Sequence, residues 1–120
     1  MTISNYGELA FLNTLRNTSF AVASPYIKLH IGDPGEDGTA NPAAETTRKA
    51  VSFSAASSGS MASSATVTWT NVSNTETYSY WSLWDASTAG NCLWSGAFSS
   101  SAAVTAGDTF QITSLTLTLD

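Results

Sequence analysis

Three carboxylates stand close together in a glycine-rich stretch and could bind a cation. Asp33, Glu36 and Asp37 lie within residues 32–38, and carboxylate oxygens are the ligands that Ca²⁺ prefers in proteins. Their spacing departs from the EF-hand pattern, because the regular alternation of acidic residues and the closing glutamate are absent. The favoured interpretation is a solvated turn, and no metal or other cofactor is expected.

The other residues of types that commonly act in catalysis form no recognisable catalytic site. The chain has one histidine, His30, and one cysteine, Cys92, so a site with several histidines and an intrachain disulfide are both excluded. Asp85 and Glu76 flank an aromatic segment, yet nothing suggests the paired acid and base of glycoside hydrolysis. We expect His30 to be exposed or at a sheet edge and Cys92 to be a small buried hydrophobe. The chain is predicted not to be an enzyme.

The four tryptophans leave two interpretations open. Exposed rings could stack on a sugar, whereas aromatic residues also dominate protein cores and subunit contacts. Core packing and subunit contact are favoured. The residues concerned are Trp69, Trp81, Trp84 and Trp94.

Composition narrows the class of protein. The chain has 120 residues, which fits one domain, and only 11% of them are charged, against about 25% in ordinary globular domains. Four lysines and arginines cannot form a track for a phosphate backbone, so no nucleic-acid partner is expected. Neither a signal peptide nor an apolar run of membrane-spanning length is present, so cytoplasmic synthesis and no membrane partner are expected.

One helix is predicted near the start. Asn5 can cap it, with Glu8 completing a capping-box-like pattern. Leu9, Phe11, Leu12 and Leu15 form a broad apolar stripe at helical spacing. Such a short helix is marginal unless this stripe docks on something. We therefore divide the chain into a helical attachment segment, residues 1–20, and a single β-sandwich domain, residues 21–120.

The remainder alternates with period two, as half-buried strands do. After a first strand at 26–31, residues 32–47 form a long loop that could reach a neighbour. The segment 78–84 is apolar on both sides, which predicts a central strand covered twice, with Tyr78 on the face opposite Trp81. Short strands separated by Gly- and Ser-rich turns predict an all-β fold, a jelly-roll-like β-sandwich of about 7–8 antiparallel strands with a short N-terminal helix. The other strands are predicted at residues 48–53, 66–70, 93–98, 109–113 and 115–119, with 54–64 as a linker or wide turn.

Several short motifs in a fixed order resemble a known family. They are Leu15-Arg16-Asn17-Thr18, residues 26–35 (YIKLHIGDPG), residues 48–53 (RKAVSF), residues 81–86 (WSLWDA), Ala106-Gly107-Asp108-Thr109 and residues 115–119 (LTLTL). In this order they are similar to small virion proteins of tailed bacteriophages, labelled tail fibre, head fibre or decoration protein. The resemblance implies a β-sandwich structural subunit, trimeric and without catalysis. This chain departs from the family in a longer acidic stretch between Gly35 and Thr47.

The first functional hypothesis is a capsid decoration or cement protein that binds and stabilises the assembled head. Its partners would be the major capsid protein and copies of itself, with no small-molecule substrate, and its location the virion. The predicted interaction surface consists of Leu9, Leu12, Leu15, Asp33, Glu36, Asp37 and Trp84.

Two alternatives belong to other classes. A tail fibre or tail-tip receptor-binding module predicts exposed tryptophans and loop tips that face a host glycan, although such modules usually follow a long shaft. A hydrolase or lectin-like domain predicts loss of turnover when Asp85 or Glu76 is replaced.

Overall fold

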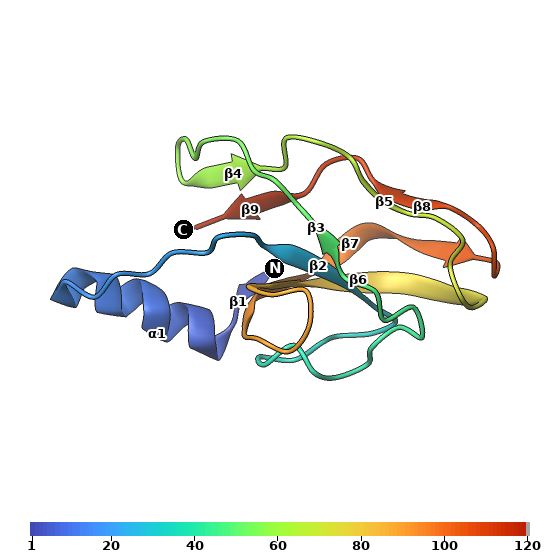
Figure 1. Cartoon of the computed structure of the whole chain (residues 1–120), viewed down its shortest axis with the longest axis horizontal. Coiled ribbons are helices and arrows are strands. Elements are labelled where there is room, and N and C mark those ends of the chain that lie inside the picture. Colours follow the sequence, from blue (N-terminus) through green and yellow to red (C-terminus); the bar gives the residue numbers. More distant parts are fainter. Residues whose placement is uncertain (120) are drawn as a thin grey trace.

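The computed structural model describes residues 1–119 and shows two layers of antiparallel strands with one helix projecting from one end (Figure 1). The molecule is elongated, with principal extents of 47 × 26 × 23 Å. The predicted all-β fold with a short N-terminal helix is confirmed, whereas the jelly-roll topology stays a prediction. None of the described helices is long and apolar enough to cross a membrane.

The larger layer is a five-stranded sheet in the order β1-β7-β6-β2-β3. Its strands are β1 (Thr2–Ile3), β7 (Cys92–Val104), β6 (Glu76–Trp84), β2 (Tyr26–His30) and β3 (Lys49–Ala50). Ile27 lies opposite Leu83 and Leu29 opposite Trp81, and side chains of directly opposite residues share a face. All four are buried in the core between the layers, so the next residue of β2, His30, faces the outer side.

The smaller layer consists of two ladders along one ribbon. β4 (Ser60–Ala62) pairs with β9 (Thr116–Thr118), and β5 (Val67–Trp69) pairs with β8 (Phe110–Ile112). The chain crosses from the larger layer directly after β3, since Ser64 N donates to Ser52 O at 2.8 Å. This crossing closes one side of the sandwich.

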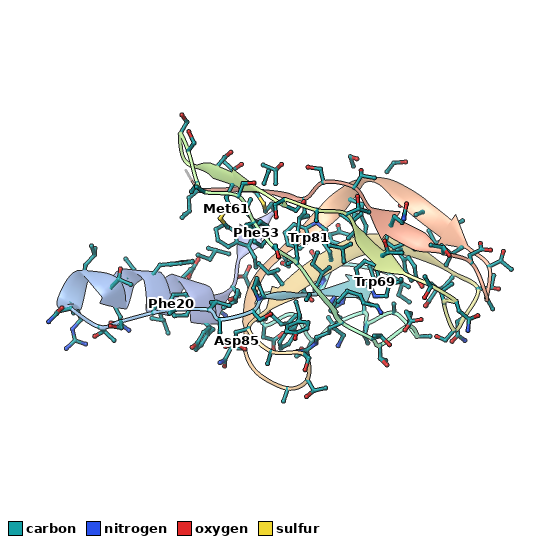
Figure 2. The ribbon with its side chains drawn as sticks, turned by 45° about the horizontal axis from the view of Figure 1, so that its top comes forward. Phe20, Phe53, Met61, Trp69, Trp81 and Asp85 are labelled. Carbon is teal, nitrogen blue, oxygen red and sulfur yellow. The ribbon has the colours of Figure 1, made fainter. Side chains whose placement is uncertain are left out.

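The core between the layers is built largely of aromatic and branched side chains. Trp69 and Trp81 lie between the layers (Figure 2) and are 1% and 3% exposed. Tyr78 is fully buried, with its ring 5.0 Å from that of Phe110. The prediction that Tyr78 lies on the face opposite Trp81 is wrong, because a register shift between Tyr78 and Tyr80 reverses the alternation.

The outer face of β6 is covered by the chain's own loop. Residues 32–48 fold back beside β2, where Ala43 N donates to Leu29 O at 3.1 Å and Ile31 N donates to Asn41 O at 3.0 Å (Figure 1). β6 is therefore central and covered on both sides, as its sequence predicted. The loop that was expected to extend to a neighbour is mostly packed on its own sheet.

Two elements escaped prediction. β4 lies within the stretch predicted as a linker, where its serines and alanines carry a weak strand signal and pairing with β9 decides the structure. β1 pairs with β7 through Thr2 and Ile3, so the chain's first residues belong to the larger sheet.

Candidate interaction surfaces

The helix begins one residue earlier than predicted. Ser4 is the N-cap of α1 (Asn5–Asn13), and its Oγ accepts a hydrogen bond from Gly7 N at 2.9 Å, so the prediction that Asn5 caps the helix is wrong. Ser4 Oγ also donates to Cys92 O, and Ser4 N donates to Leu93 O at 3.0 Å. The start of the helix is thereby fixed to the start of β7.

A glycine lets the helix approach the sheet closely. A Cβ atom on Gly7 would lie 2.7 Å from Leu93 O and 3.0 Å from Ile3 Cγ1, too near for any side chain to fit without a shift. Farther along, Phe11 packs edge-on against Trp94 and Phe20, at ring centroid distances of 6.0 and 5.3 Å. These contacts define the inner face of the helix.

The predicted apolar stripe is divided between two faces of the helix: Phe11 packs inward, and the three leucines lie on the outer face. Leu9 and Leu12 are each 63% exposed, and Leu15, in the 3₁₀ turn η1 (Thr14–Arg16) that extends α1, is 85% exposed. Asn17, with φ of 62°, ends the element. Three exposed leucines in one short element form an apolar surface that docking would remove from water. We call Leu9, Leu12 and Leu15 the leucine stripe.

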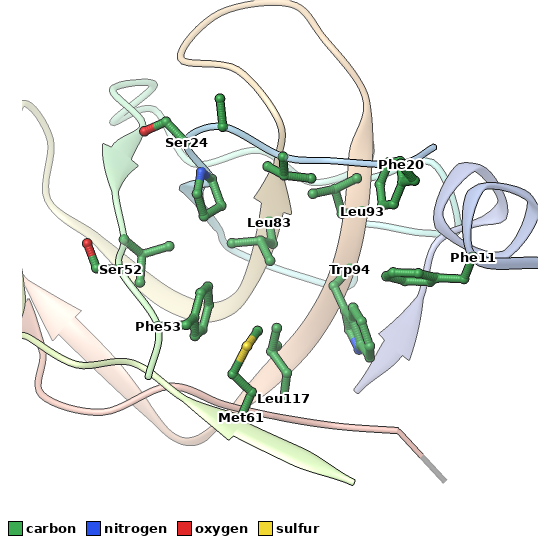
Figure 3. A pocket seen from close by; sticks show the side chains of 14 residues that line it. Phe11, Phe20, Ser24, Ser52, Phe53, Met61, Leu83, Leu93, Trp94 and Leu117 are labelled. Atoms are coloured by element: carbon green, nitrogen blue, oxygen red, sulfur yellow. The ribbon is translucent and has the colours of Figure 1, made fainter. Parts of the chain in front are cut away.

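An apolar groove of about 510 Å³ opens beside the helix, between the two layers (Figure 3). Phe11 and Phe20 line it from the helical end, and Phe53, Met61 and Leu117 line it from the smaller layer. Sequence reasoning missed this groove, because its walls come from segments far apart in the chain. Figure 3 shows these side chains turned toward one another around Leu83 and Trp94.

The acidic loop tip is exposed, but its carboxylates serve the loop itself. Asp33 Oδ1 accepts from Gly35 N at 2.9 Å, and Asp37 Oδ1 accepts from the hydroxyl of Thr39 at 2.8 Å. Hydrogen bonds from the hydroxyl and the backbone N–H of Thr39 lower the pKa of Asp37. Glu36 is exposed, and its carbonyl oxygen accepts from Asn5 N at 3.3 Å, which ties the loop tip to the helix. Within residues 1–119, no group of three or more potential metal ligands is brought together.

Trp84 lies on the outer face of the larger sheet but is covered by the loop. Its side chain is 6% exposed, so Trp84 is not accessible as part of the predicted interaction surface. The Arg48 guanidinium lies over the ring at 4.0 Å from the centroid, and Gly38 packs against the ring edge. Arg48 Nη1 also donates to Ala86 O at 2.9 Å and to Ala89 O at 2.7 Å, so this residue joins the loop after β6 to the loop before β3.

His30 is also buried, and the expectation of an exposed or edge position is wrong. Its Nδ1 lies 2.9 Å from Ala40 O and its Nε2 lies 2.7 Å from Ser82 Oγ. Burial lowers the pKa of His30, which favours the neutral imidazole. The loop over the outer face conceals the histidine, and the alternation of β2 alone could not reveal that cover.

The carboxylates considered for catalysis hold loops in place. Glu76 accepts from Ala44 N at 2.9 Å and from Glu45 N at 3.0 Å. Asp85 accepts from Asn91 N at 2.7 Å across the turn that follows β6. Because each carboxylate is engaged by backbone N–H groups of a different loop, the two do not form an acid–base pair.

Cys92 is buried, as predicted, and burial raises the pKa of its thiol to about 11. A thiol with so high a pKa is protonated at neutral pH and is a poor nucleophile. The tryptophans are 1–7% exposed, so none of the four offers an open ring face to a sugar in this structure.

Comparison with known families identifies the family of this chain. Residues 2–120 match the family model described as podophage GP4 fiber I protein gp80. The chain belongs to this family. No curated protein matches the chain significantly.

Membership of the gp80 fibre family confirms the resemblance to small phage virion proteins. The match spans nearly the whole chain, so it includes the helix, both layers and the acidic loop. The family is described as a podophage fibre protein, and the chain is therefore a phage structural protein. Its interaction surface stays a prediction, with six of the seven residues exposed and Trp84 buried.

Proposed function

We propose that this protein is a subunit of a fibre on the virion of a podophage. The observation that carries the proposal is the match of residues 2–120 to a family described as a podophage fibre protein. This supports the fibre alternative over the capsid decoration role that was first expected. The protein acts by binding and not by catalysis, since its candidate carboxylates hold loops in place.

The surface that attaches the subunit is the end of the molecule that carries α1. The leucine stripe is exposed there, and the apolar groove opens beside the same helix. Full burial of a leucine side chain is worth about 1.5–3 kcal/mol, so three leucines can supply much of the affinity of a docking contact. The partner is another virion protein with an apolar recess for these side chains.

The long axis of the molecule suits this arrangement. Because the molecule is 47 Å long and the helix projects from one end (Figure 1), docking of that end leaves the far turns between β5 and β6 and between β7 and β8 pointing away. The acidic tip at 33–37 lies near the helix start and borders the attached end. It would add polar contacts at the rim of the interface.

Immunogold electron microscopy of intact virions tests the proposal, with antibody raised against the purified chain. Gold on fibres that project from the particle is expected. Gold spread evenly over the head would overturn the fibre assignment in favour of capsid decoration. Particles that stay unlabelled while a parallel antibody labels the coat protein would exclude both locations.

A further inference from the structure

Residues 33–42 cover the outer face of the larger sheet, on the side away from the smaller layer (Figure 1). We call them the cover segment. His30 of β2 is fully buried beneath it, and Cys92 at the start of β7 is 4% exposed, because Gly38 packs closely against its sulfur. The core between the layers lies on the opposite face of the sheet, so movement of the cover segment would leave that core closed.

The cover segment is attached to its surroundings through its own carbonyl groups. Backbone N–H groups and one ring N–H from outside the segment bond to these carbonyls. The ring nitrogen carries a proton here, because a carbonyl only accepts. Loss of these bonds would therefore report release of the segment. Asn5 N donates to Glu36 O at 3.3 Å, Ile31 N to Asn41 O at 3.0 Å and His30 Nδ1 to Ala40 O at 2.9 Å.

The His30 side chain is the attachment that mild acid can change, since an imidazole gains its second proton in this pH range. Its Nε2 lies 2.7 Å from Ser82 Oγ, and the same oxygen accepts from Trp84 Nε1 at 2.7 Å. A neutral ring accepts the serine proton at Nε2. A protonated ring removes that acceptor, so Ser82 would receive two N–H groups while its own hydroxyl proton had no partner. Protonation therefore leaves a buried polar group unsatisfied.

The charges around His30 also oppose a second proton. Burial, and then the positive charges of Lys28 on β2 and of Arg48 at the end of the loop, lower the pKa of His30. From β6, the Tyr80 phenol lies directly opposite in register. The carboxylates of the cover segment bond within the segment and are not among the charges that act on the ring. A protonated His30 is therefore a buried cation beside two others, and its cost falls when water reaches the ring.

We propose that the cover segment is a pH-sensitive lid, which is closed while His30 is neutral and released when His30 is protonated. Release gives water access to both ring nitrogens, while the two layers stay folded. It uncovers Cys92 and the edge of the Trp84 ring, both of which pack against Gly38 in the closed form. The aromatic contact predicted at Trp84 thus becomes accessible in acid. Release can be measured on the purified full-length chain, and its failure would leave the fibre proposal untouched.

Amide hydrogen exchange between about pH 7 and pH 5 tests the release. Protection factors, which exclude the intrinsic pH dependence of exchange, should fall at Asn5 and Ile31 by about tenfold for each unit by which the pKa of His30 lies below 6.5. His30 is the only histidine, so its NMR titration provides that pKa directly. Protection should stay constant at Ser63 and Ser64, whose N–H groups bond within the sandwich. An equal fall at all four amides, or none at Asn5 and Ile31, would overturn the inference.

The thiol of Cys92 gives a second readout that needs no variant, because it is the only cysteine in the chain. A dithiodipyridine reagent, which reacts with thiols in acid as well as at neutral pH, measures its accessibility. The rate for the folded protein, divided by the rate for the urea-unfolded protein at the same pH, should rise as the pH falls through the same range. A constant ratio would show that the cover segment stays closed.

Three variants separate His30 from the other charges. His30→Gln has no second proton to gain, so its protection factors and thiol reactivity should not respond to acid. Lys28→Met removes a charge that acts on the ring and should respond less than the wild type. Lys49→Met is the matched control, since it removes the same charge from the neighbouring strand β3 and should respond like the wild type. A full response in His30→Gln, or a lost response in Lys49→Met, would overturn the inference.

Discussion

The Nε2 atom of His30 and the Oγ atom of Ser82 lie 2.7 Å apart on the covered outer face of the larger sheet. Trp84 Nε1 donates to the same Ser82 oxygen at 2.7 Å, and His30 Nδ1 lies 2.9 Å from Ala40 O. A carbonyl only accepts, so Nδ1 carries the proton and Nε2 accepts from the serine hydroxyl. When His30 is neutral, each polar group in this buried series of hydrogen bonds, from Trp84 through Ser82 and His30 to Ala40, therefore has a partner.

We predict that acid weakens the fold through His30. Burial, with smaller contributions from Lys28 and Arg48, lowers the pKa of His30 below its ordinary value of 6.5. A base whose pKa is depressed by folding binds fewer protons in the folded state, so its contribution to stability is complete above pH 6.5 and is lost as the pH falls through the folded-state value. Urea unfolding across this range should show the loss in the wild type and a smaller one in His30→Gln. Parallel pH profiles would contradict the assignment.

A second prediction concerns how tightly the loop over Trp84 is packed. Gly38 and Gly35 have nearly the same backbone, with φ of 74° and 77°. A Cβ atom on Gly38 would lie 2.5 Å from Cys92 Sγ, whereas one on Gly35 meets only an Asp37 oxygen at 3.9 Å. Gly35→Ala should cost about 1–2 kcal/mol of backbone strain, and Gly38→Ala about 1–3 kcal/mol more from overpacking.

The difference between the two alanine variants measures that packing, because the backbone strain is common to both. Denaturant unfolding at equal protein concentration provides the two free energies. Equal destabilisation would mean that the loop does not rest on Trp84 and Cys92 in solution.

The sequence predicts the strands that its alternation specifies and misses those that tertiary pairing decides. β2 and β9 have clean alternation of large apolar residues with polar ones, and both form where expected. β4 has one large apolar residue, Met61, and forms because β9 lies beside it. The face of Tyr78 depends on extra residues in the partner strand, which cannot be read from β6 itself.

The part of the candidate surface that lies within one helix was predictable from the sequence. The part formed by segments far apart in the chain was missed. The leucine stripe follows from helical spacing, and its leucines are exposed. The burial of Trp84 depends on Arg48 and Gly38, which belong to a loop some forty residues earlier in the chain and pack on the ring. No pattern around Trp84 distinguishes an outward ring from one that a distant loop covers.

The buried hydroxyl of Tyr78 leads to a third prediction. It has no hydrogen-bond partner among the described residues, and burial raises its pKa from 10.0 to about 12. Removal of an unsatisfied buried polar group relieves a desolvation cost, so Tyr78→Phe should leave the free energy of unfolding unchanged or raise it by about 1 kcal/mol. A loss larger than about 1 kcal/mol would show that the hydroxyl is bonded in solution.

The pH dependence of the free energy of unfolding, compared between the wild type and Tyr78→Phe, provides an independent check. A group whose pKa is raised by folding contributes stability that is complete below pH 10 and is lost as the pH rises toward 12. The advantage of Tyr78→Phe over the wild type should therefore grow across that interval. An advantage that stays constant would mean that Tyr78 titrates alike in the folded and unfolded chains.

The last prediction separates attachment from folding within one helix. Leu12 is 63% exposed, whereas its neighbour Phe11 packs against Trp94 and Phe20. Leu12→Gln should change the free energy of unfolding by no more than about 0.5 kcal/mol, because an exposed side chain loses no packing. Phe11→Ala should cost about 3 kcal/mol, near the low end for a phenylalanine, since Phe11 is only partly buried.

Incorporation into virions should depend on Leu12, although the stability of the fold does not. In a phage complemented with each variant, Leu12→Gln should reduce the protein recovered with purified particles although it is folded, because a polar side chain replaces a docking leucine. Asn74→Lys, at an exposed site in the far turn between β5 and β6, should be incorporated like the wild type. If Leu12→Gln particles carry the full amount of protein, the leucine stripe is not the attachment surface, and the apolar groove beside it becomes the next surface to vary.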